Sequence, residues 1–177
     1  MSILRMHVVI LAALVSLYSW GEVKTKEQVS AEAKAGATHI SSKQLAEDVS
    51  DGRPLLLLDI RTAAEFQAGH IRGAQWLPRG GIEFSIQELT TDPDARIVLY
   101  CRSGGRSALA AASLKGIGDN NVVDLEGGFE DWLETGNTFY NLHGEHRVVS
   151  YGAEESPRGK FDVGNPIPGY RGTHPDR

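Results

Sequence analysis

Short apolar runs recur through the middle of this 177-residue chain, and they constrain the fold more than any other feature. Leu55–Ile60 and Ile97–Tyr100 are too short and too uniformly apolar for amphipathic helices, so they predict buried strands. Amphipathic stretches separate the apolar runs from about residue 38 to residue 136, which is typical of βα units on both faces of a parallel sheet. The sequence therefore predicts an α/β fold with an open parallel sheet and helices on both faces.

Cap and turn signals predict the remaining elements. Capping boxes at Ser41 with Gln44 and at Thr62 with Glu65 start two short helices, the first of which ends near Gly52. Apolar periodicity and helix breakers then predict strands at 74–77 and 122–125, and helices at 82–89, 108–115 and 129–133.

The two ends of the chain differ from this central part. In residues 1–21, Arg5 precedes an apolar run, so we expect a signal peptide and export to the periplasm, with an uncleaved membrane anchor as the alternative. Residues 22–37 are polar and look like a linker. Residues 137–177 hold four of the seven prolines, so we expect an irregular or partly disordered C-terminal extension, with a short strand at 147–151 at most.

Charge and cysteine content exclude several classes of site. The net charge of −5 argues against a nucleic-acid-binding surface. A single cysteine excludes an internal disulfide and any zinc or iron–sulfur site built from several cysteines. His143, His146 and His174 could be considered as metal ligands, but their spacing is a weak signal, and we expect surface histidines, no metal and no cofactor.

Cys101, the only cysteine, directly follows the apolar run that ends at Tyr100. In open α/β sheets, ligands bind at the carboxyl ends of the strands. Two glycines in the loop that follows permit a tight turn into a helix, and the backbone N–H groups of such a turn converge on an anion. We expect these amides, the helix dipole, Arg102 and Arg106 to favour the thiolate of Cys101, which is the nucleophilic form.

The alternative is that Cys101 is a small apolar side chain at the end of a core strand, as many buried free cysteines are. Two observations weigh against packing alone. A lone free thiol in an exported protein invites oxidation, and this thiol is surrounded in sequence by Gly, Ser and Arg. We therefore interpret Cys101 as a reactive residue.

At this point the sequence resembles a known family. The loop from Cys101 to Arg106 resembles the six-residue active-site loop of rhodaneses. Across residues 38–136, further segments match that family in type, order and spacing, and the resemblance implies a rhodanese domain over this range. These segments are Asp59-Ile60-Arg61 with Glu65-Phe66, Gly69-His70-Ile71-Arg72-Gly73-Ala74, Tyr100-Cys101, and Leu125-Glu126-Gly127-Gly128-Phe129 with Trp132.

The resemblance implies a thiosulfate sulfurtransferase. Cys101 would attack the outer sulfur of a small anionic donor such as thiosulfate and become a persulfide, from which a thiol or cyanide acceptor removes the sulfur. Arg106 is the first choice for anchoring the donor and Arg102 the second. A sulfur-relay protein is a further class of partner that the resemblance implies. The substrate-binding cradle would consist of Arg102, Ser103, Gly104, Gly105, Arg106 and Ser107.

Two alternative functions remain. A persulfide carrier that does not turn over small molecules would use the same loop. A phosphatase is disfavoured because related phosphatases have one more residue between Cys and Arg, which widens the cradle for phosphate, whereas four residues intervene here.

For the other polar and aromatic residues of the matching segments we favour structural roles. Asp59 and Arg61 are expected to pair with each other or with loop amides and so hold the fold. Glu65 is interpreted as a helix cap, and His70 as a residue that turns the chain. The tryptophans Trp76 and Trp132 are expected in the core or at its rim.

Overall fold

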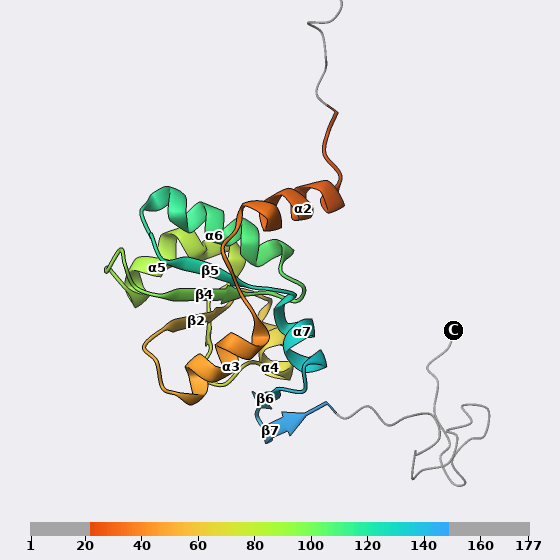
Figure 1. Ribbon diagram of the computed structural model, residues 1–177. Coiled ribbons are helices and arrows are strands. Elements are labelled where there is room, and N and C mark those ends of the chain that lie inside the picture. Colours follow the sequence, from red (N-terminus) through yellow and green to blue (C-terminus); the bar gives the residue numbers. More distant parts are fainter. Residues whose placement is uncertain (1–21, 149–177) are drawn as a thin grey trace, which may run out of the picture.

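A computed structural model describes residues 22–148, and five parallel strands form its central sheet (Figure 1). The strands lie in the order β1-β5-β4-β2-β3. The predicted open parallel α/β sheet is therefore confirmed, and the two long apolar runs form the neighbouring strands β2 and β4. The strand bounds are β1 His39–Ile40, β2 Leu56–Asp59, β3 Gln75–Trp76, β4 Ile97–Tyr100 and β5 Val122–Leu125.

Two hydrophobic cores, one on each face of the sheet, explain why β4 is apolar throughout. One core lies between the sheet and the helices α5 (Ile82–Leu89) and α6 (Gly105–Ile117). The other lies between the sheet and the helices α3 (Ser42–Ser50) and α7 (Gly128–Glu134). Figure 1 shows the two pairs of helices on opposite sides of the sheet. Successive strand residues point to opposite faces, so every residue of β4 is buried in one core or the other.

The predicted capping boxes begin α3 and α4 (Ala63–Ala68). In each box the Ser41 or Thr62 hydroxyl accepts a backbone N–H three residues later, and the side chain there accepts the N–H of the cap residue. The helix α6 begins at Gly105, three residues before the predicted start at Ala108. The turn is tighter than expected because Gly104 adopts a left-handed conformation with φ of +92°.

The segment 22–37, expected to be a linker, instead contains the helix α2 (Lys26–Gly36). Thr25 and Gln28 form a capping box at its start, and the helix packs against α6 (Figure 1). The prediction failed because no residue of α2 is buried. At the start of α6 it contributes the polar side chains of Ser30 and Lys34, and the segment lacks the buried apolar stripe by which an amphipathic helix is recognised.

The C-terminal extension, expected to be irregular, begins with an antiparallel hairpin of β6 (Thr138–Asn141) and β7 (Gly144–Arg147). Phe139 of β6 packs against the core that α3 and α7 cover. The short strand predicted at 147–151 is misplaced, because Arg147 is the last residue of β7. Residues 149–177 lie outside the described part of the chain.

The predicted signal peptide at 1–21 also lies outside the described residues, so export stays a prediction. Within residues 22–148, no helix is long and apolar enough to cross a membrane. In the same range, no group of three or more His, Cys, Asp or Glu side chains is arranged to hold a metal ion. His146 contacts the Asn141 side chain at 2.9 Å and stacks on Phe139, and His174 is outside the described range.

A buried ion pair holds the chain after β2. The Arg61 guanidinium donates to both carboxylate oxygens of Asp59, from Nη2 to Oδ2 at 2.6 Å and from Nε to Oδ1 at 2.9 Å. The same Nη2 donates to the Gly69 carbonyl at 2.6 Å, and the guanidinium lies over the Phe129 ring, 4.2 Å from its centroid. Asp59 and Arg61 therefore pair with each other, as the structural interpretation predicts.

The first turn of α7 anchors the chain where it leaves β4. Phe129 N donates to the Cys101 carbonyl at 2.8 Å, and Glu130 N donates to the Arg102 carbonyl at 3.0 Å. Gly128 makes this approach possible, because a Cβ added to it would lie 2.6 Å from the Cys101 carbonyl oxygen. Its φ of +65° is also in the left-handed region that favours glycine.

Gly128→Ala is therefore expected to destabilise the protein by about 2 kcal/mol or more, because backbone strain and backbone overlap act together. Gly116→Ala is the matched control, since nothing lies within 4 Å of a Cβ at this helical position and alanine favours a helix by about 0.5–1 kcal/mol. Urea unfolding of the two variants measures both effects. Equal stability of the two variants would contradict the anchoring role of Gly128.

Candidate active site

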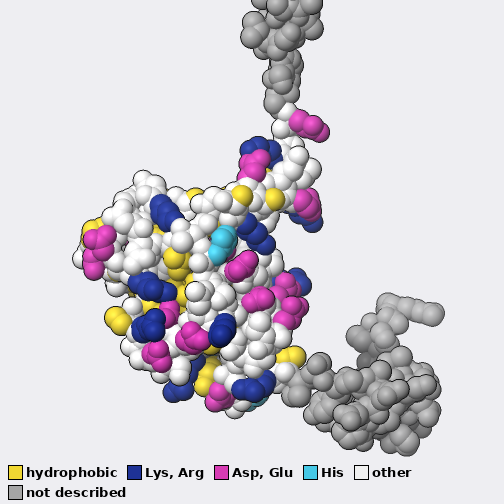
Figure 2. Space-filling model, viewed as in Figure 1, with side chains coloured by type: hydrophobic (Ala, Val, Ile, Leu, Met, Phe, Trp, Pro, Cys, Tyr) yellow, Lys and Arg dark blue, Asp and Glu magenta, His cyan; other side chains and the backbone are white. Residues whose placement is uncertain are grey.

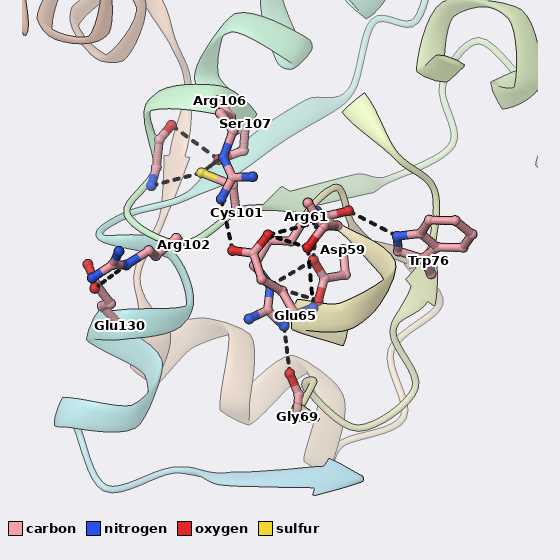
Figure 3. A network of polar contacts seen from close by, with 12 residues as sticks. Asp59, Arg61, Glu65, Gly69, Trp76, Cys101, Arg102, Arg106, Ser107 and Glu130 are labelled. Atoms are coloured by element: carbon pink, nitrogen blue, oxygen red, sulfur yellow. Dashed lines mark hydrogen bonds and ion pairs between the residues drawn. The ribbon is translucent and has the colours of Figure 1, made fainter. Parts of the chain in front are cut away.

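The sulfur of Cys101 lies at the carboxyl end of β4 with two donor groups of its own loop beside it (Figure 3). Gly104 N donates to Sγ at 3.2 Å, and the Ser107 hydroxyl lies 3.4 Å from Sγ and 3.1 Å from the Gly104 carbonyl oxygen. Cys101 itself is 1% exposed. Donors that point at the sulfur stabilise negative charge on it, as an oxyanion hole does for oxygen.

The two loop arginines point in different directions (Figure 3). Arg106 Nη2 donates to Glu65 Oε1 at 3.2 Å, and Glu65 and Cys101 raise the pKa of Arg106 above its ordinary value although burial opposes the charge. Arg102 Nε instead donates to Glu130 Oε1 at 2.6 Å, and its side chain is 70% exposed. The geometry thus places Arg106 beside the sulfur and Arg102 on the outer rim.

Glu65 has a second role besides the predicted cap. Partial burial opposes its ionisation, but the Thr62 backbone N–H, the Arg106 guanidinium and the Thr62 hydroxyl lower the pKa of Glu65 to about 2. The carboxylate therefore stays charged at neutral pH and holds Arg106 on the Cys101 side of the loop.

A pocket of about 630 Å³ opens in front of Cys101. Four of the predicted cradle residues line it together with Cys101, namely Arg102, Ser103, Gly105 and Arg106. The other two, Gly104 and Ser107, are buried and contact the sulfur from the protein side. The structure therefore brings the predicted loop residues around one thiol. The far wall is α2 and the residues before it, which the sequence analysis had assigned to a linker.

A buried carboxyl group that the sequence analysis did not single out lies behind the loop. Asp124 of β5 is 1% exposed, and a Cβ added to Gly104 would lie 3.5 Å from its Oδ2. Within residues 22–148, neither carboxyl oxygen has a hydrogen bond of good geometry. Burial raises the pKa of Asp124 to about 6, although Ser107, His39 and Lys34 partly offset this effect.

The His39 ring lies between α2 and Asp124. Its Nε2 lies 2.7 Å from the Lys34 carbonyl oxygen, and a carbonyl only accepts, so Nε2 carries a hydrogen. Its Nδ1 lies 3.3 Å from Asp124 Oδ2, a contact that needs a proton on one of the two atoms. The pair links the end of α2 to the floor of the active-site loop.

The remaining residues that the sequence analysis considered have structural contacts. Trp76 Nε1 donates to the Arg61 carbonyl at 2.9 Å, and its ring is at the rim. His70 Nδ1 lies 3.0 Å from the Phe66 carbonyl oxygen, and its backbone pairs with Tyr140 of the hairpin. None of these contacts involves the Cys101 sulfur.

With this geometry established, comparison with known proteins identifies the family. Residues 41–135, more than half of the chain, match the model of the rhodanese-like domain. The chain belongs to the rhodanese-like family. The family match begins after α2 and ends before the hairpin, whereas the resemblance in sequence suggested residues 38–136.

Relatives of this rhodanese-like chain are named as sulfurtransferases. It is 40% identical over 97 residues to a sulfurtransferase of Allochromatium vinosum, covering 55% of this chain and 89% of that protein. It is 38% identical over 96 residues to the thiosulfate sulfurtransferase GlpE of Ectopseudomonas mendocina, covering 54% and 84%. The probable adenylyltransferase/sulfurtransferase MoeZ of Mycobacterium tuberculosis is 37% identical over 104 residues, which is 59% of this chain but 26% of that protein.

A solved structure agrees with the fold. A Rhodopseudomonas palustris protein of unknown function, described as a possible tyrosine phosphatase, superposes with a TM-score of 0.57 and 28% identity, over 64% of this chain and 92% of that one. The comparisons therefore support a sulfurtransferase family, while one neighbour carries the competing phosphatase description.

Asp124→Asn is expected to remove a pH dependence of stability. The folded protein holds the Asp124 proton more tightly than the unfolded chain, because the pKa rises from 3.8 to about 6. The contribution to stability is thus full below about pH 4 and is lost as the pH rises through about 6, by roughly 3 kcal/mol. Urea unfolding between about pH 4 and pH 7.5 measures this loss.

Asp51→Asn, at an exposed carboxyl group, is the control and should follow the parent protein. The free energy of unfolding of Asp124→Asn should fall less with rising pH than that of the parent. A constant difference between the parent and Asp124→Asn across this pH range would contradict the assignment.

Proposed function

We propose that the protein is a sulfurtransferase that moves the outer sulfur of thiosulfate or a related donor to a thiol or cyanide through a persulfide on Cys101. The observation that carries the proposal is the arrangement of donors around one sulfur. Gly104 N–H and the Ser107 hydroxyl point at Sγ, and Arg106 lies beside it at the edge of a pocket.

In the first step, the Cys101 thiolate attacks the outer sulfur of thiosulfate. The new bond joins Sγ to that sulfur, the sulfur–sulfur bond of thiosulfate breaks, and sulfite leaves with the electron pair. Charge balances, because a thiolate and a thiosulfate dianion give a persulfide anion and a sulfite dianion. Arg106 would bind the sulfonate oxygens of the donor, held in place by Glu65.

In the second step, the acceptor attacks the outer sulfur of the persulfide. With cyanide the products are thiocyanate and the Cys101 thiolate, so the chain returns to its starting state. In the thiolate the negative charge lies on Sγ, at which Gly104 N–H and the Ser107 hydroxyl point, whereas in the persulfide it lies on the outer sulfur, on the pocket side, where Arg106 is the nearest cation of the loop.

A persulfide carrier is the second candidate function. It is favoured by the low exposure of Cys101, since a buried sulfur is protected from small molecules that do not fit the pocket. A carrier and an enzyme differ in whether they turn over with small acceptors such as cyanide. The experiment described next separates the two.

The purified protein is expected to gain about 32 Da, the mass of one sulfur atom, when it is incubated with thiosulfate. Intact-mass spectrometry with peptide mapping should place the gain on Cys101, and Cys101→Ser should lose both the gain and thiocyanate formation. A gain without thiocyanate formation would favour the carrier. Hydrolysis of an aryl phosphate with no gain from thiosulfate would favour the phosphatase description of the structural neighbour.

Arg106→Gln is expected to raise the KM for thiosulfate by about tenfold or more, because it removes a charged hydrogen-bond donor beside the sulfur. Arg102→Gln is the matched control from the same loop. Its side chain is 70% exposed and paired with Glu130, so we expect a change of about threefold at most. Steady-state thiocyanate formation gives both constants. Equal effects of the two substitutions would contradict the assignment of Arg106 as the anchor.

A further inference from the structure

The helix α2 lies directly on the active-site loop. A Cβ added to Gly105 would overlap with the side chain of Ser30, although Gly105 itself has a helical conformation that any residue adopts. A Cβ added to Gly104 would lie 3.2 Å from Cε of Lys34. At position 105 it is therefore the approach of α2, and not the backbone conformation, that limits the size of the residue, because Ser30 Cβ would lie 3.2 Å from the added Cβ.

This helix is an addition to the family domain. The family match begins at residue 41, whereas α2 spans Lys26–Gly36. Its capping box and its contact with α6 give it a defined position, yet none of its residues is buried. A helix that contributes no buried residue to the core, but lies on the catalytic loop, has its main effect on the site.

The pocket between α2 and the loop is larger than thiosulfate or cyanide requires. Its volume of about 630 Å³ lies within the range of about 300–1,000 Å³ that is typical of pockets for organic ligands. Two apolar side chains line it, Val29 of α2 and Leu109 of α6. Leu109 is 40% exposed, which leaves apolar surface for a ligand to cover.

The charged residues that line this pocket are all cationic. They are Lys24 and Lys26 on the α2 side and Arg102 and Arg106 on the loop, and no carboxylate is among the lining residues. Each of the four cations has a carboxylate partner, but these partners lie outside the lining, so the cationic groups are the charges that face the pocket. The carboxylate partners are Glu32, Glu27, Glu130 and Glu65. Elsewhere charge is mixed, and Figure 2 shows basic and acidic side chains interspersed on one face. In a chain of net charge −5, such a lining favours an anionic ligand.

We propose that α2 is the acceptor-selecting wall of the site, and that the pocket takes an organic thiol with a short apolar chain that ends in an anionic group. The apolar chain lies between Val29 and Leu109, and the anionic end lies at Lys24 and Lys26. This inference rests on the proposed function and names the class of its acceptor.

Sulfur transfer to this acceptor balances without a further reagent. The acceptor sulfur attacks the outer sulfur of the Cys101 persulfide anion, and the bond from that sulfur to Sγ breaks. The thiol proton passes to the transferred sulfur. One thiol and one persulfide anion thus give one organic persulfide and the Cys101 thiolate.

Four acceptors test the proposal on the full chain. Mercaptohexanoate has the apolar chain and the charged end, mercaptohexanol has the chain alone, and mercaptoacetate has the charged end on a short chain. Cyanide is a small nucleophile with neither the chain nor a separate charged end group. With Cys101 loaded from thiosulfate, kcat/KM should be highest for mercaptohexanoate. In parallel, intact-mass spectrometry measures whether the persulfide of mercaptohexanoate transfers its outer sulfur to Cys101.

Two variants separate the two features. Val29→Ser should lower kcat/KM for both six-carbon thiols relative to mercaptoacetate by about fivefold, because it removes an apolar contact. The double variant Lys24→Gln with Lys26→Gln should lower the ratio of mercaptohexanoate to mercaptohexanol by a similar factor. Ala31→Ser, at an exposed position of α2 outside the pocket lining, is the control and should keep both ratios. Circular dichroism checks that α2 remains folded.

The outcomes distinguish this inference from the proposed function. If thiosulfate loads Cys101 but all ratios stay within twofold of the parent in every variant, α2 does not select the acceptor and the proposed function stands. If the organic persulfide loads Cys101 and thiosulfate does not, thiosulfate is the wrong donor and the organic pocket is supported. If neither compound loads Cys101, both proposals are overturned.

Discussion

The carboxyl end of β4 is the point on which the active site depends, because β4 is buried on both faces and has a neighbouring strand on each edge. A chain that leaves such a strand must turn at once, and its polar backbone groups need partners. Here the backbone N–H groups in the first turn of α7 donate to the Cys101 and Arg102 carbonyls, and the Gly104 N–H donates to the Cys101 sulfur. The thiol is therefore fixed by the same hydrogen bonds that end the strand.

Much of the arrangement of strands and loop around Cys101 could be predicted from the sequence, because the apolar residues show which segments are buried. The bounds of β4, β5 and α5 agree with the predicted 97–100, 122–125 and 82–89, since β4 and β5 contribute to both cores and α5 to one of them. The loop was predicted because glycine, serine and arginine after a buried strand have few structural uses other than an anion site. The anchoring of the loop by α7 was not predicted, since hydrogen bonds between Gly128–Glu134 and the loop leave no periodic signal.

The features that the sequence analysis missed share a physical cause, which is contact without apolar burial. The helix α2 meets the start of α6 with polar side chains, and its capping box at Thr25 and Gln28, the same signal used for α3 and α4, was the available evidence. Asp124 also had a signal, because a carboxyl group inside the apolar run 122–125 must be buried with the strand. Both features contact the active-site loop through polar groups, which an apolar sequence pattern does not reveal.

Asp124 sets an electrostatic limit on the loop that covers it. The donors on the Cys101 side favour a negative sulfur, whereas an ionised Asp124 behind Gly104 adds a negative charge in a buried setting where repulsion is weakly screened. The His39 imidazole lies against this carboxyl group, with Nδ1 3.3 Å from Asp124 Oδ2, and the Nε2 bond to the Lys34 carbonyl fixes the ring. Because Lys34 belongs to α2, the helix that walls the pocket also positions this ring beside the carboxyl group under the loop. The wall and the floor of the site are in this way one connected polar network.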